Sequence, residues 1–347
     1  MTSQDITIGI IGAGGIVRQR HMPGLATIPG VRVLAVSNRT RASGERFAHE
    51  YHVPHVLDDW RQLVTMPEID AVWIGTWPYM HHPMTVAALD AGKHVFSQAR
   101  MAMNVHEARE MLRKAHERPQ LVTMLCPPPN GMKGDALMRK LVGEGYLGKL
   151  YNLLVRDLGT AYMDPEAPLC WRQIWSLSGY NTLALGIYAE RLHGWFGTAR
   201  KVVALDRTFI PERTTSEGKI GKAERPESVA ICAELENGAL AHYFFSGVAR
   251  HSGHSMVEAY GSEGTLIYDM TTDEIKGARA GEKGLQPIPI PPELAREWTV
   301  EADFIAGIRE GKKPSPSFED GVKYMEFTEA VFRSVERGSV VTLPLED

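Results

Sequence analysis

A short apolar strand that runs into a cluster of glycines constrains the fold of this chain more than any other feature. Residues 6–11 are apolar and mostly β-branched, and Gly12-Ala13-Gly14-Gly15 follows directly. Four further short apolar runs, at 31–36, 71–74, 94–96 and 121–125, alternate with segments of helical spacing. Strands that alternate with helices are typical of βαβ units, so we expect a doubly wound parallel sheet in the first third of the chain.

A proline-rich stretch at residues 126–131 breaks this rhythm, and we place the domain boundary there, between residues 1–126 and 127–347. Longer strand-like runs follow at 150–157, 202–209, 229–235, 239–245, 256–260 and 265–268. Glu236-Asn237-Gly238 between two of them is a strong hairpin signal. We expect an α+β second domain with an open, mostly antiparallel sheet, covered on one face by a helix near 181–196 and by C-terminal helices. Those C-terminal helices are also free to pack back on the first domain.

One segment of the second domain is charged and contains glycine and proline, at residues 212–227. Such composition is typical of surface connections, so we expect a mobile loop there.

The composition excludes several function classes. The 347 residues carry a net charge of −4 with basic residues spread along the chain, which argues against nucleic-acid and membrane partners. We find no signal peptide and no apolar run long enough to cross a membrane. Cys126, Cys170 and Cys232 are far apart and odd in number, so we expect neither disulfides nor a metal site, and a cytoplasmic location.

The glycine cluster predicts a dinucleotide site of Rossmann type. Gly12 permits a tight turn, and Gly14 lets the backbone approach a pyrophosphate. Gly15 and Ile16 open the next helix, whose free N–H groups and dipole favour an anion. A plain structural turn is the alternative, and Val17 at the third glycine position loosens the match.

The end of the second strand bears on the choice of nucleotide. An acidic residue there binds the ribose hydroxyls of NAD, but this chain has Asn38 and Arg39. Asn38 does not repel a 2′-phosphate and Arg39 can pair with one, which favours NADP over NAD. Alternatively, Arg39 is a solvated residue at the start of a helix.

Several separated motifs resemble the glucose–fructose oxidoreductase, inositol dehydrogenase and MocA family. They are the glycine turn followed by His21-Met22-Pro23, the stretches 76–81 and 88–95, Trp171-Arg172, and the closing segments 308–311 and 314–321. The resemblance implies a Rossmann domain joined to an open sheet whose face carries the substrate site. It adds Thr76 and Gln98 to the expected cofactor-binding residues.

The chain departs from this family where the resemblance implies proton transfer. The family's Glu-Lys-Pro is Gln98-Ala99-Arg100 here, so alanine replaces the lysine. The family's Asp and His, four residues apart on one helix, correspond to Ala184 and Tyr188. All three usual acid–base groups are therefore absent.

Other residues are candidates for the chemistry. Tyr188, Arg100 and Asn181 are our catalytic candidates: a phenol has an ordinary pKa near ~10, which we expect Arg100 and the nicotinamide charge to lower. Positions three and four apart share a helix face, which places Asn181 and Arg191 with Tyr188. Arg191, Arg172 and His81 are the candidate substrate ligands. A core aromatic, ion pairs and a helix-capping histidine are the structural alternatives. Arg156 and Asp157, which end a strand, are weaker candidates to face the substrate.

The sequence therefore predicts an NAD(P)-dependent oxidoreductase that moves hydride to or from a hydroxyl or carbonyl carbon of a sugar, polyol or sugar acid. The loss of all three acid–base groups favours an alternative, a lyase, hydrolase or isomerase without net redox change. A nucleotide-binding protein without catalysis is the third hypothesis. We also expect a homo-oligomer formed through the open sheet.

Overall fold

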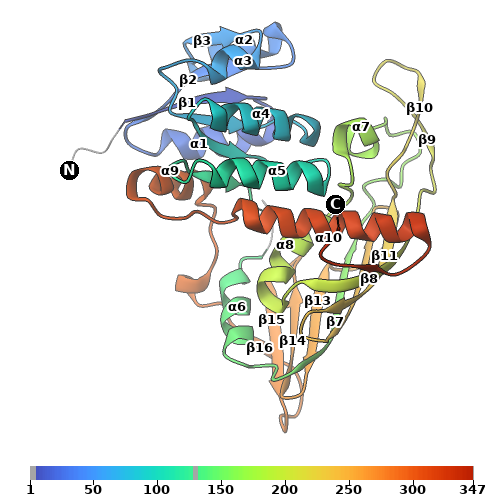
Figure 1. The fold of residues 1–347 in the computed structure, drawn as a ribbon. Coiled ribbons are helices and arrows are strands. Elements are labelled where there is room, and N and C mark those ends of the chain that lie inside the picture. The colour runs from blue at the N-terminus through green and yellow to red at the C-terminus, as the bar shows by residue number, and fades with distance from the viewer. Residues whose placement is uncertain (1–4, 128–131, 347) are drawn as a thin grey trace. The chain divides into compact units, whose positions relative to one another are not determined.

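The computed structural model describes residues 5–127 and 132–346. The chain divides into two compact units (Figure 1): unit 1 comprises Met1–Pro127 and Trp298–Val322, and unit 2 comprises Pro128–Glu297 and Lys323–Asp347. Residues 128–131 of the proline-rich stretch lie outside the described residues. Each unit is described by itself.

Unit 1 is built on a six-stranded parallel sheet, as the alternating pattern predicted. The strands are β1 (Ile6–Ile11), β2 (Val31–Ser37), β3 (His55–Leu57), β4 (Ala71–Ile74), β5 (His94–Ser97) and β6 (Thr123–Leu125). Their order is β3-β2-β1-β4-β5-β6. Every residue of β1 and β4 is buried, as expected for parallel strands covered on both faces.

The helices of unit 1 begin with a side-chain cap in three cases, at Thr40, Asp59 and Asn104. They are η1 (Val17–His21), α1 (Met22–Ala26), α2 (Arg41–Tyr51), α3 (Trp60–Val64), α4 (Pro78–Asp90), α5 (Val105–His116) and α9 (Val300–Glu310). Asn104 accepts a hydrogen bond from the Glu107 N–H at the start of α5, and the Glu107 carboxylate accepts one from the Met103 N–H. Asn104 therefore caps α5, and Glu107 bonds the N–H of the residue before the cap, one residue beyond the position of a capping box.

A late segment of the chain completes the core of unit 1. Trp73 of β4 stacks on Phe96 of β5 with ring centroids 3.7 Å apart, and Phe304 of α9 packs edge-on against both rings. The Leu125 N–H also donates to the Pro316 carbonyl. Residues 298–322 are therefore part of the hydrophobic core around the parallel sheet.

Unit 2 is built on a nine-stranded sheet in the order β16-β15-β14-β13-β7-β12-β11-β8-β17. The strands are β7 (Leu150–Leu158), β8 (Ala199–Arg207), β11 (Ser228–Leu235), β12 (Leu240–Ser246), β13 (Met256–Gly261), β14 (Gly264–Asp269), β15 (Glu274–Arg279), β16 (Gln286–Ile288) and β17 (Val341–Thr342). Only β7 and β12 pair in parallel, so the expected mostly antiparallel sheet is confirmed. The sequence did not predict β15, β16 or β17.

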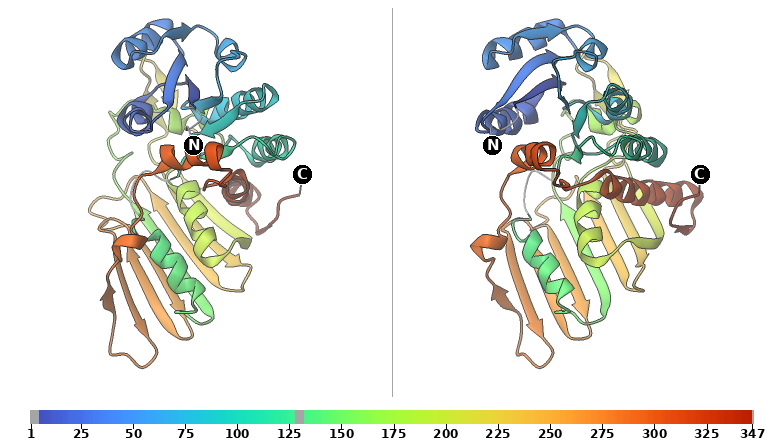
Figure 2. Two further views of the ribbon diagram at one scale, coloured as in Figure 1. Left: turned by 90° about the vertical axis from the view of Figure 1, so that its left-hand side faces the viewer. Right: turned by 60° about the vertical axis from the view of Figure 1, so that its left-hand side comes forward.

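Helices cover one face of this sheet. The helices of unit 2 are α6 (Asp135–Gly143), η2 (Trp171–Gln173), α7 (Trp175–Ser178), α8 (Leu185–Phe196), η3 (Pro292–Leu294) and α10 (Phe318–Arg337), and the boundary between the units falls within α10. Figure 2 shows α6 and α8 against the sheet. Along β7, Leu153 and Val155 are buried while Leu154 and Arg156 are exposed, so the opposite face is open.

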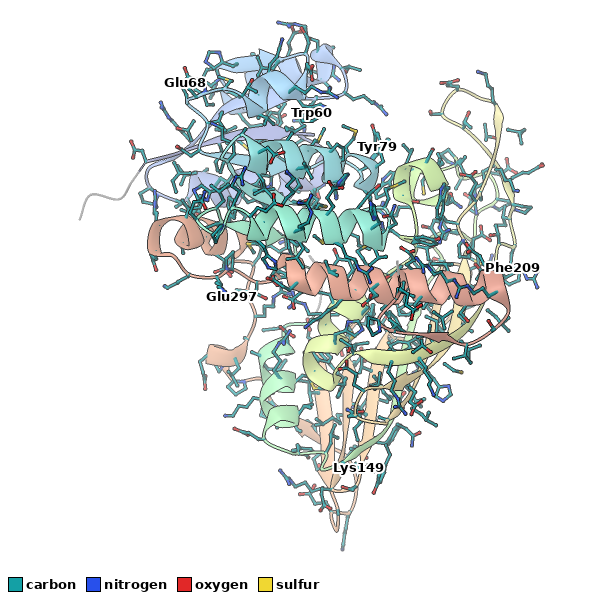
Figure 3. All side chains as sticks on the ribbon, in the orientation of Figure 1. Trp60, Glu68, Tyr79, Lys149, Phe209 and Glu297 are labelled. Atoms are coloured by element: carbon teal, nitrogen blue, oxygen red, sulfur yellow. The ribbon has the colours of Figure 1, made fainter. Side chains whose placement is uncertain are left out.

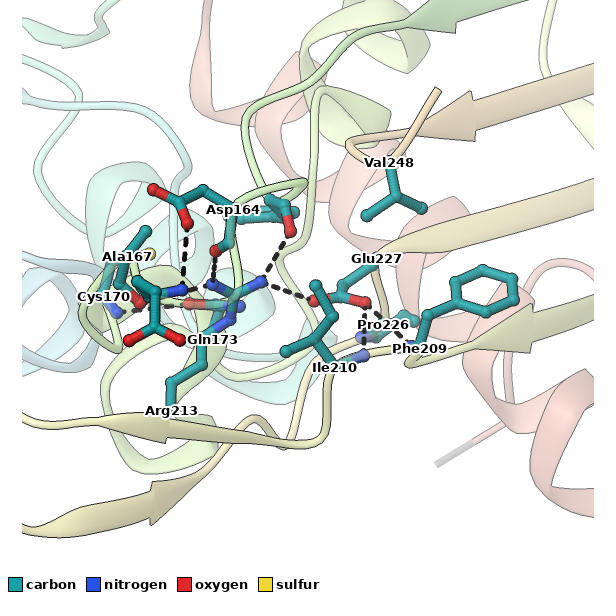
Figure 4. Close-up of polar contacts among 12 residues, drawn as sticks. Asp164, Ala167, Cys170, Gln173, Phe209, Ile210, Arg213, Pro226, Glu227 and Val248 are labelled. Carbon is teal, nitrogen blue, oxygen red and sulfur yellow. Dashed lines mark hydrogen bonds and ion pairs between the residues drawn. The ribbon is translucent and has the colours of Figure 1, made fainter. Parts of the chain in front are cut away.

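The prediction of a mobile loop at residues 212–227 is wrong. This segment forms a hairpin of β9 (Glu212–Thr214) and β10 (Ile220–Lys222), which an ion pair anchors. The Arg213 guanidinium lies 3.0 Å from the carboxylate of Glu227, and the two side chains are 1% and 0% exposed; Figure 4 draws the contacts of this pair. Arg213 also donates to the carbonyls of Tyr162 and Asp164, and Glu227 accepts from two backbone N–H groups. The charged residues of this segment indicated a solvated loop, but Arg213 and Glu227 are buried because their opposite charges form an ion pair.

No helix in the described ranges is long and apolar enough to cross a membrane. Residues 5–127 and 132–346 contain no group of three or more His, Cys, Asp or Glu side chains that could hold a metal ion.

Candidate functional site

The candidate cofactor site of unit 1 is a cavity of about 380 Å³ at the carboxyl ends of β1, β2 and β4. The residues that line it are Gly12, Ala13, Gly14, Asn38, Arg39, Thr40, Ser43, Arg46, Gly75, Thr76, Trp77 and Tyr79. The sheet order reverses between β1 and β4. Ligands of open α/β sheets bind at this kind of switch point.

Glycine is required at two places in the wall of this cavity. Gly12 has φ +84°, and a Cβ there would lie 2.7 Å from Thr76 Cγ2. A Cβ at Gly75 would lie 2.5 Å from the Gly12 carbonyl oxygen. The turns after β1 and β4 therefore touch through their backbones.

Above Gly14 the cavity is open. A Cβ at Gly14 would meet no heavy atom within 4 Å, which leaves space for a ligand to approach the backbone. The helical segment that ends with α1 begins at Gly15, and its first N–H groups are available to an anion. Asn38 Oδ1 accepts from the Ala13 N–H at 2.7 Å and fixes the turn from the neighbouring strand. These residues are suited to hold the pyrophosphate of a dinucleotide.

The rim of the cavity near β2 is positively charged. Arg39 lies over the Trp77 ring, with 5.4 Å from Cζ to the ring centroid, and Arg46 follows on α2. Thr40 caps α2 by accepting from the Ser43 N–H. None of the described residues that line the cavity carries a carboxylate. This rim is suited to a phosphate group beyond the pyrophosphate.

Most of the predicted cofactor residues come together here. Gly12, Gly14, Asn38, Arg39 and Thr76 line the cavity, whereas Gly15, Ile16 and Gln98 do not. The sequence reasoning missed Thr40, Ser43, Arg46, Trp77 and Tyr79 (Tyr79 is labelled in Figure 3). The signal for Ser43 and Arg46 was available, because they lie three and six residues beyond the Thr40 cap on one face of α2.

Gln98 belongs to a buried network beside the cavity wall. Its amide contacts His21 Nε2, and His21 Nδ1 lies 2.5 Å from Glu301 Oε1. His21 and Glu301 are 0% and 2% exposed. If His21 Nδ1–H donates to Glu301, Nε2 is the acceptor for the Gln98 amide N–H. The network therefore fixes the orientation of the Gln98 amide at the end of β5.

His81 connects the ends of two strands. Its Nδ1 lies 2.9 Å from the Arg100 carbonyl and its Nε2 lies 3.0 Å from the Thr76 carbonyl. Burial lowers the pKa of the His81 imidazole, against the effect of these backbone hydrogen bonds. Both ring nitrogens thus face backbone, which favours the structural alternative, and a substrate contact by His81 stays a prediction. Arg100 is 7% exposed at the end of the same connection.

The second cluster of interest lies in unit 2, around Tyr188 of α8. The Tyr188 hydroxyl donates to Asp157 Oδ1 at 3.1 Å, and the Ser255 hydroxyl donates to the same oxygen at 2.5 Å. Phe245 packs edge-on against the Tyr188 ring. Asp157 lies near the carboxyl end of β7, and Ser255 directly precedes β13.

The expectation of a lowered pKa for Tyr188 is wrong. Burial of the ring and the negative charge of Asp157 raise the pKa of the phenol well above its usual value. The hydrogen-bond partner is a carboxylate and not a cation, so the neutral phenol is stabilised. Tyr188 is a hydrogen-bond donor in this structure and not a phenolate.

The remaining candidates in unit 2 already have partners. Asn181 is buried and its Nδ2 donates to the Ser178 carbonyl at 2.7 Å. Arg191 lies 3.2 Å from Asp135 of α6 and 3.2 Å from Glu190, so its charge is matched between the two helices. Arg172 is exposed, with its guanidinium 4.2 Å from the Trp171 ring centroid. Roles for all three at a substrate stay predictions.

Comparison with known proteins covers both units. Residues 6–125 match the family described as "Oxidoreductase family, NAD-binding Rossmann fold", and residues 136–267 match the GFO/IDH/MocA C-terminal domain. Levoglucosan dehydrogenase of Pseudarthrobacter phenanthrenivorans is 25% identical, over 98% of this chain and 99% of its own length. The 1,5-anhydro-D-fructose reductase of Ensifer adhaerens is 26% identical, over 96% and 98%.

Solved structures share the fold over nearly the whole chain. A levoglucosan dehydrogenase in complex with NADH and L-sorbose superposes with a TM-score of 0.87 at 24% identity, covering 98% of this chain and 99% of that one. An oxidoreductase domain protein from Kribbella flavida gives a TM-score of 0.88 at 24% identity, covering 99% and 100%. The matches confirm the resemblance carried by the sequence motifs: the chain belongs to the GFO/IDH/MocA family of oxidoreductases.

Proposed function

We propose that this protein is an NAD(P)-dependent oxidoreductase that interconverts a hydroxyl and a carbonyl group on a sugar, polyol or sugar acid. The observation that supports this most strongly is the cradle at the end of β1. Gly12 and Gly75 bring two backbone turns into contact there, and Gly14 leaves open space beside the start of a helix. Family membership supports the same class of reaction.

Different residues of the cavity hold different parts of the nucleotide. The backbone at Gly14 and Gly15 holds the pyrophosphate, while Asn38 keeps the turn in place. Trp77 and Tyr79 offer flat apolar surfaces for the adenine. The nicotinamide supplies the hydride acceptor or donor when it is bound.

The substrate class follows from the relatives. Those with printed activities include a levoglucosan dehydrogenase, a 1,5-anhydro-D-fructose reductase and a myo-inositol 2-dehydrogenase. Each name denotes oxidation or reduction on a polyhydroxylated ring. We assign the same class of substrate to this chain, with Arg172 as the exposed candidate for an acidic group.

The test is turnover of a small panel. Levoglucosan, L-sorbose, myo-inositol and 1,5-anhydro-D-fructose are incubated with each oxidised or reduced nucleotide, and absorbance at the nicotinamide band is followed. Net formation or consumption of reduced nucleotide supports the proposal. Conversion of a sugar without net reduction supports the alternative lyase, hydrolase or isomerase. Nucleotide binding without conversion of any sugar supports the non-catalytic alternative.

We further propose that NADP is preferred over NAD. Arg39, Thr40, Ser43 and Arg46 surround the part of the cavity beyond Asn38 with two cations and two hydroxyls. Arginine pairs with phosphate through charge-assisted hydrogen bonds. Arg39→Ala should weaken NADP binding by about tenfold, equivalent to about 1.4 kcal/mol, and leave NAD binding within about twofold.

Arg41 provides the matched control for this test. Arg41 begins α2, the helix that also carries Ser43 and Arg46, but its guanidinium pairs with Glu45 and Asp58 and does not line the cavity. Arg41→Ala should leave the ratio of the two affinities unchanged. Equal weakening of NADP and NAD by Arg39→Ala would refute the preference.

For the chemistry, we propose that Tyr188 contributes as a hydrogen-bond donor, with Arg100 and Asn181 as supporting polar groups. The support for Tyr188 is its bond to Asp157 at the end of β7. Tyr188→Phe should lower kcat while nucleotide affinity stays within about twofold of wild type.

We also propose a homo-oligomer formed through the open face of the nine-stranded sheet. Leu154, Val203, Leu205 and Phe244 are 39–76% exposed on this face, beside a shallow cavity of about 640 Å³. Exposed apolar patches of this kind mark interaction sites. Leu205→Glu should shift the sedimentation coefficient towards the monomer. Ile220→Glu, on the β9–β10 hairpin and 68% exposed, is the control that should not.

A further inference from the structure

We propose that Cys232 is a site of covalent thiol modification, at which His242 is the base and an apolar α,β-unsaturated carbonyl compound is the electrophile. The site lies wholly within unit 2, on the open face of the nine-stranded sheet. It shares no residue with the nucleotide cavity, and the inference does not depend on the proposed oxidoreductase function.

Cys232 differs from the other cysteines of the chain in its exposure. Of the three, Cys126 is buried, Cys170 is half-buried and Cys232 is exposed, and all three are free of disulfide bonds. The alternation along β11 explains this, because Ile231 and Ala233 face the core and Cys232 between them faces the open side. A reagent in solution can therefore reach this thiol.

His242 lies directly opposite Cys232 in the sheet. The antiparallel register of β11 and β12 pairs the two residues. Side chains directly opposite each other on one face have Cβ atoms about 4.5–5.5 Å apart, which brings their polar atoms within reach. Cys232 Sγ lies 3.4 Å from His242 Nδ1. With the imidazole proton on Nε2, the thiol donates to Nδ1, so His242 is placed to take the thiol proton.

A cavity of about 640 Å³ adjoins this pair, and both Cys232 and His242 line it. In the strand register, Val203 of β8 is opposite Cys232 on the other side, and Leu154 of β7 is opposite His242. The large apolar side chains that line the cavity from the open face are Leu154, Val203, Leu205 and Phe244, and its charged ones are Arg156 and Glu258. An apolar compound that occupies the cavity is therefore held beside the thiol.

The proposed step balances without an oxidant. The S–H bond of Cys232 breaks and its proton bonds to His242 Nδ1, which leaves the thiolate as the nucleophile. A sulfur electron pair forms the S–C bond to the β-carbon of the electrophile. The electron pair of the C=C double bond moves to the α-carbon, and the imidazolium then returns the proton to that carbon. The product is a thioether on Cys232.

The test measures the rate of modification at each cysteine. The full chain is reacted with N-phenylmaleimide, an apolar α,β-unsaturated carbonyl compound, and each cysteine is followed by peptide mass spectrometry. N-acetylcysteine is the reference thiol, because it has neither a base nor a cavity beside it. Cys232 should react at least about tenfold faster than this reference, and Cys170 should react more slowly than the reference because it is half-buried.

Replacing His242 tests the base. Asparagine keeps a polar group beside the thiol but has no basic nitrogen. A positioned base contributes about 10²–10⁴-fold in a closed active site, and this pair is exposed, so His242→Asn should lower the rate at Cys232 by about tenfold. Leu240→Asn is the matched control, because Leu240 is exposed on the same face of β12 but does not line the cavity. It should leave the rate at Cys232 unchanged.

The probe itself tests the cavity. A maleimide that carries a carboxylate in place of the phenyl ring has the same reacting atoms but no apolar group. Its rate at Cys232, relative to N-acetylcysteine, should lie well below that of N-phenylmaleimide. Equal relative rates for the two probes overturn the assignment of an apolar electrophile.

The homo-oligomer proposed above would cover the same face, so the rates are also measured in Leu205→Glu, with and without His242→Asn. The ratio of these two rates cancels the direct effect of the new glutamate. Protection of Cys232 in the wild type, together with a reaction in Leu205→Glu that depends on His242, supports the inference. Cys232 that reacts no faster than N-acetylcysteine in either background overturns it. A rate that His242→Asn leaves unchanged in both backgrounds overturns it as well.

Discussion

Replacing Glu227 by Gln should destabilise unit 2 more than any change of a surface charge. The carboxylate is 0% exposed and pairs with Arg213 at 3.0 Å, so the substitution removes the only carboxylate that this buried guanidinium contacts among the described residues. Breaking a buried pair by removing one partner costs about 3–5 kcal/mol. The Tyr162 and Asp164 carbonyls still solvate Arg213, which places the cost near the lower limit.

The loss converts into a measurable thermal shift. For a unit of this size, about 1 kcal/mol corresponds to about 2–4 °C in Tm, so a cost of about 3 kcal/mol should lower the transition of unit 2 by about 6–12 °C in Glu227→Gln. Differential scanning calorimetry measures that transition. Hydrogen exchange should also increase at residues 159–170, which follow β7 and are held by Arg213.

A second ion pair on the same hairpin is the control. Lys219 and Glu217 lie 3.1 Å apart but are 78% and 72% exposed. Exposed pairs contribute about 0–1 kcal/mol, so Glu217→Gln should change Tm by about 4 °C at most. If Glu227→Gln and Glu217→Gln both lower Tm by the same few degrees, the reasoning about buried charge in this segment is refuted.

Three further predictions concern the two units. Gly14→Ala should leave unfolding of unit 1 unchanged, because a Cβ meets no protein atom within 4 Å, yet weaken nucleotide binding at least about tenfold in a fluorescence titration; unchanged affinity would contradict the cradle. Glu301→Gln should lower the free energy of unfolding of unit 1 in urea by about 1.5–3 kcal/mol, because the hydrogen bond from His21 Nδ1–H to a buried carboxylate is lost, and a loss below about 0.5 kcal/mol argues against that bond. Burial raises the pKa of the Tyr243 phenol above its unfolded value near ~10, so the free energy of unfolding of unit 2 should decrease as pH rises above about 10, where only the unfolded state ionises. In urea denaturation, Tyr243→Phe should reduce this alkaline decrease in the free energy of unfolding, and an unaltered decrease would count against the prediction.

The sequence predicted the parts of the fold that local signals determine. The strand–glycine–helix unit at Gly12, the cap formed by Asn104 and Glu107 and the hairpin at Gly238 were all readable, because each depends on residues adjacent in the chain. For the same reason the sequence singled out Gly14 and Arg39, which line the cavity and closely follow strand ends.

The rest depends on contacts between distant residues. Arg213 and Glu227 resemble solvated charges until the fold pairs them, so the anchored hairpin was mistaken for a mobile loop. Tyr188 and Asp157 are 31 residues apart, and the sign of the tyrosine pKa shift followed from this unseen partner. The sequence left the place of the C-terminal helices open, because no local pattern directs Phe304 onto Trp73.

The central claim is that the cavity bounded by Gly12, Gly14 and Gly75 holds a nicotinamide dinucleotide. Isothermal titration calorimetry of the full chain with NADP⁺, NAD⁺ and their reduced forms tests it most directly. The account predicts one nucleotide per chain and tighter binding of the phosphorylated form. Absence of binding heat with all four nucleotides at several temperatures would contradict it.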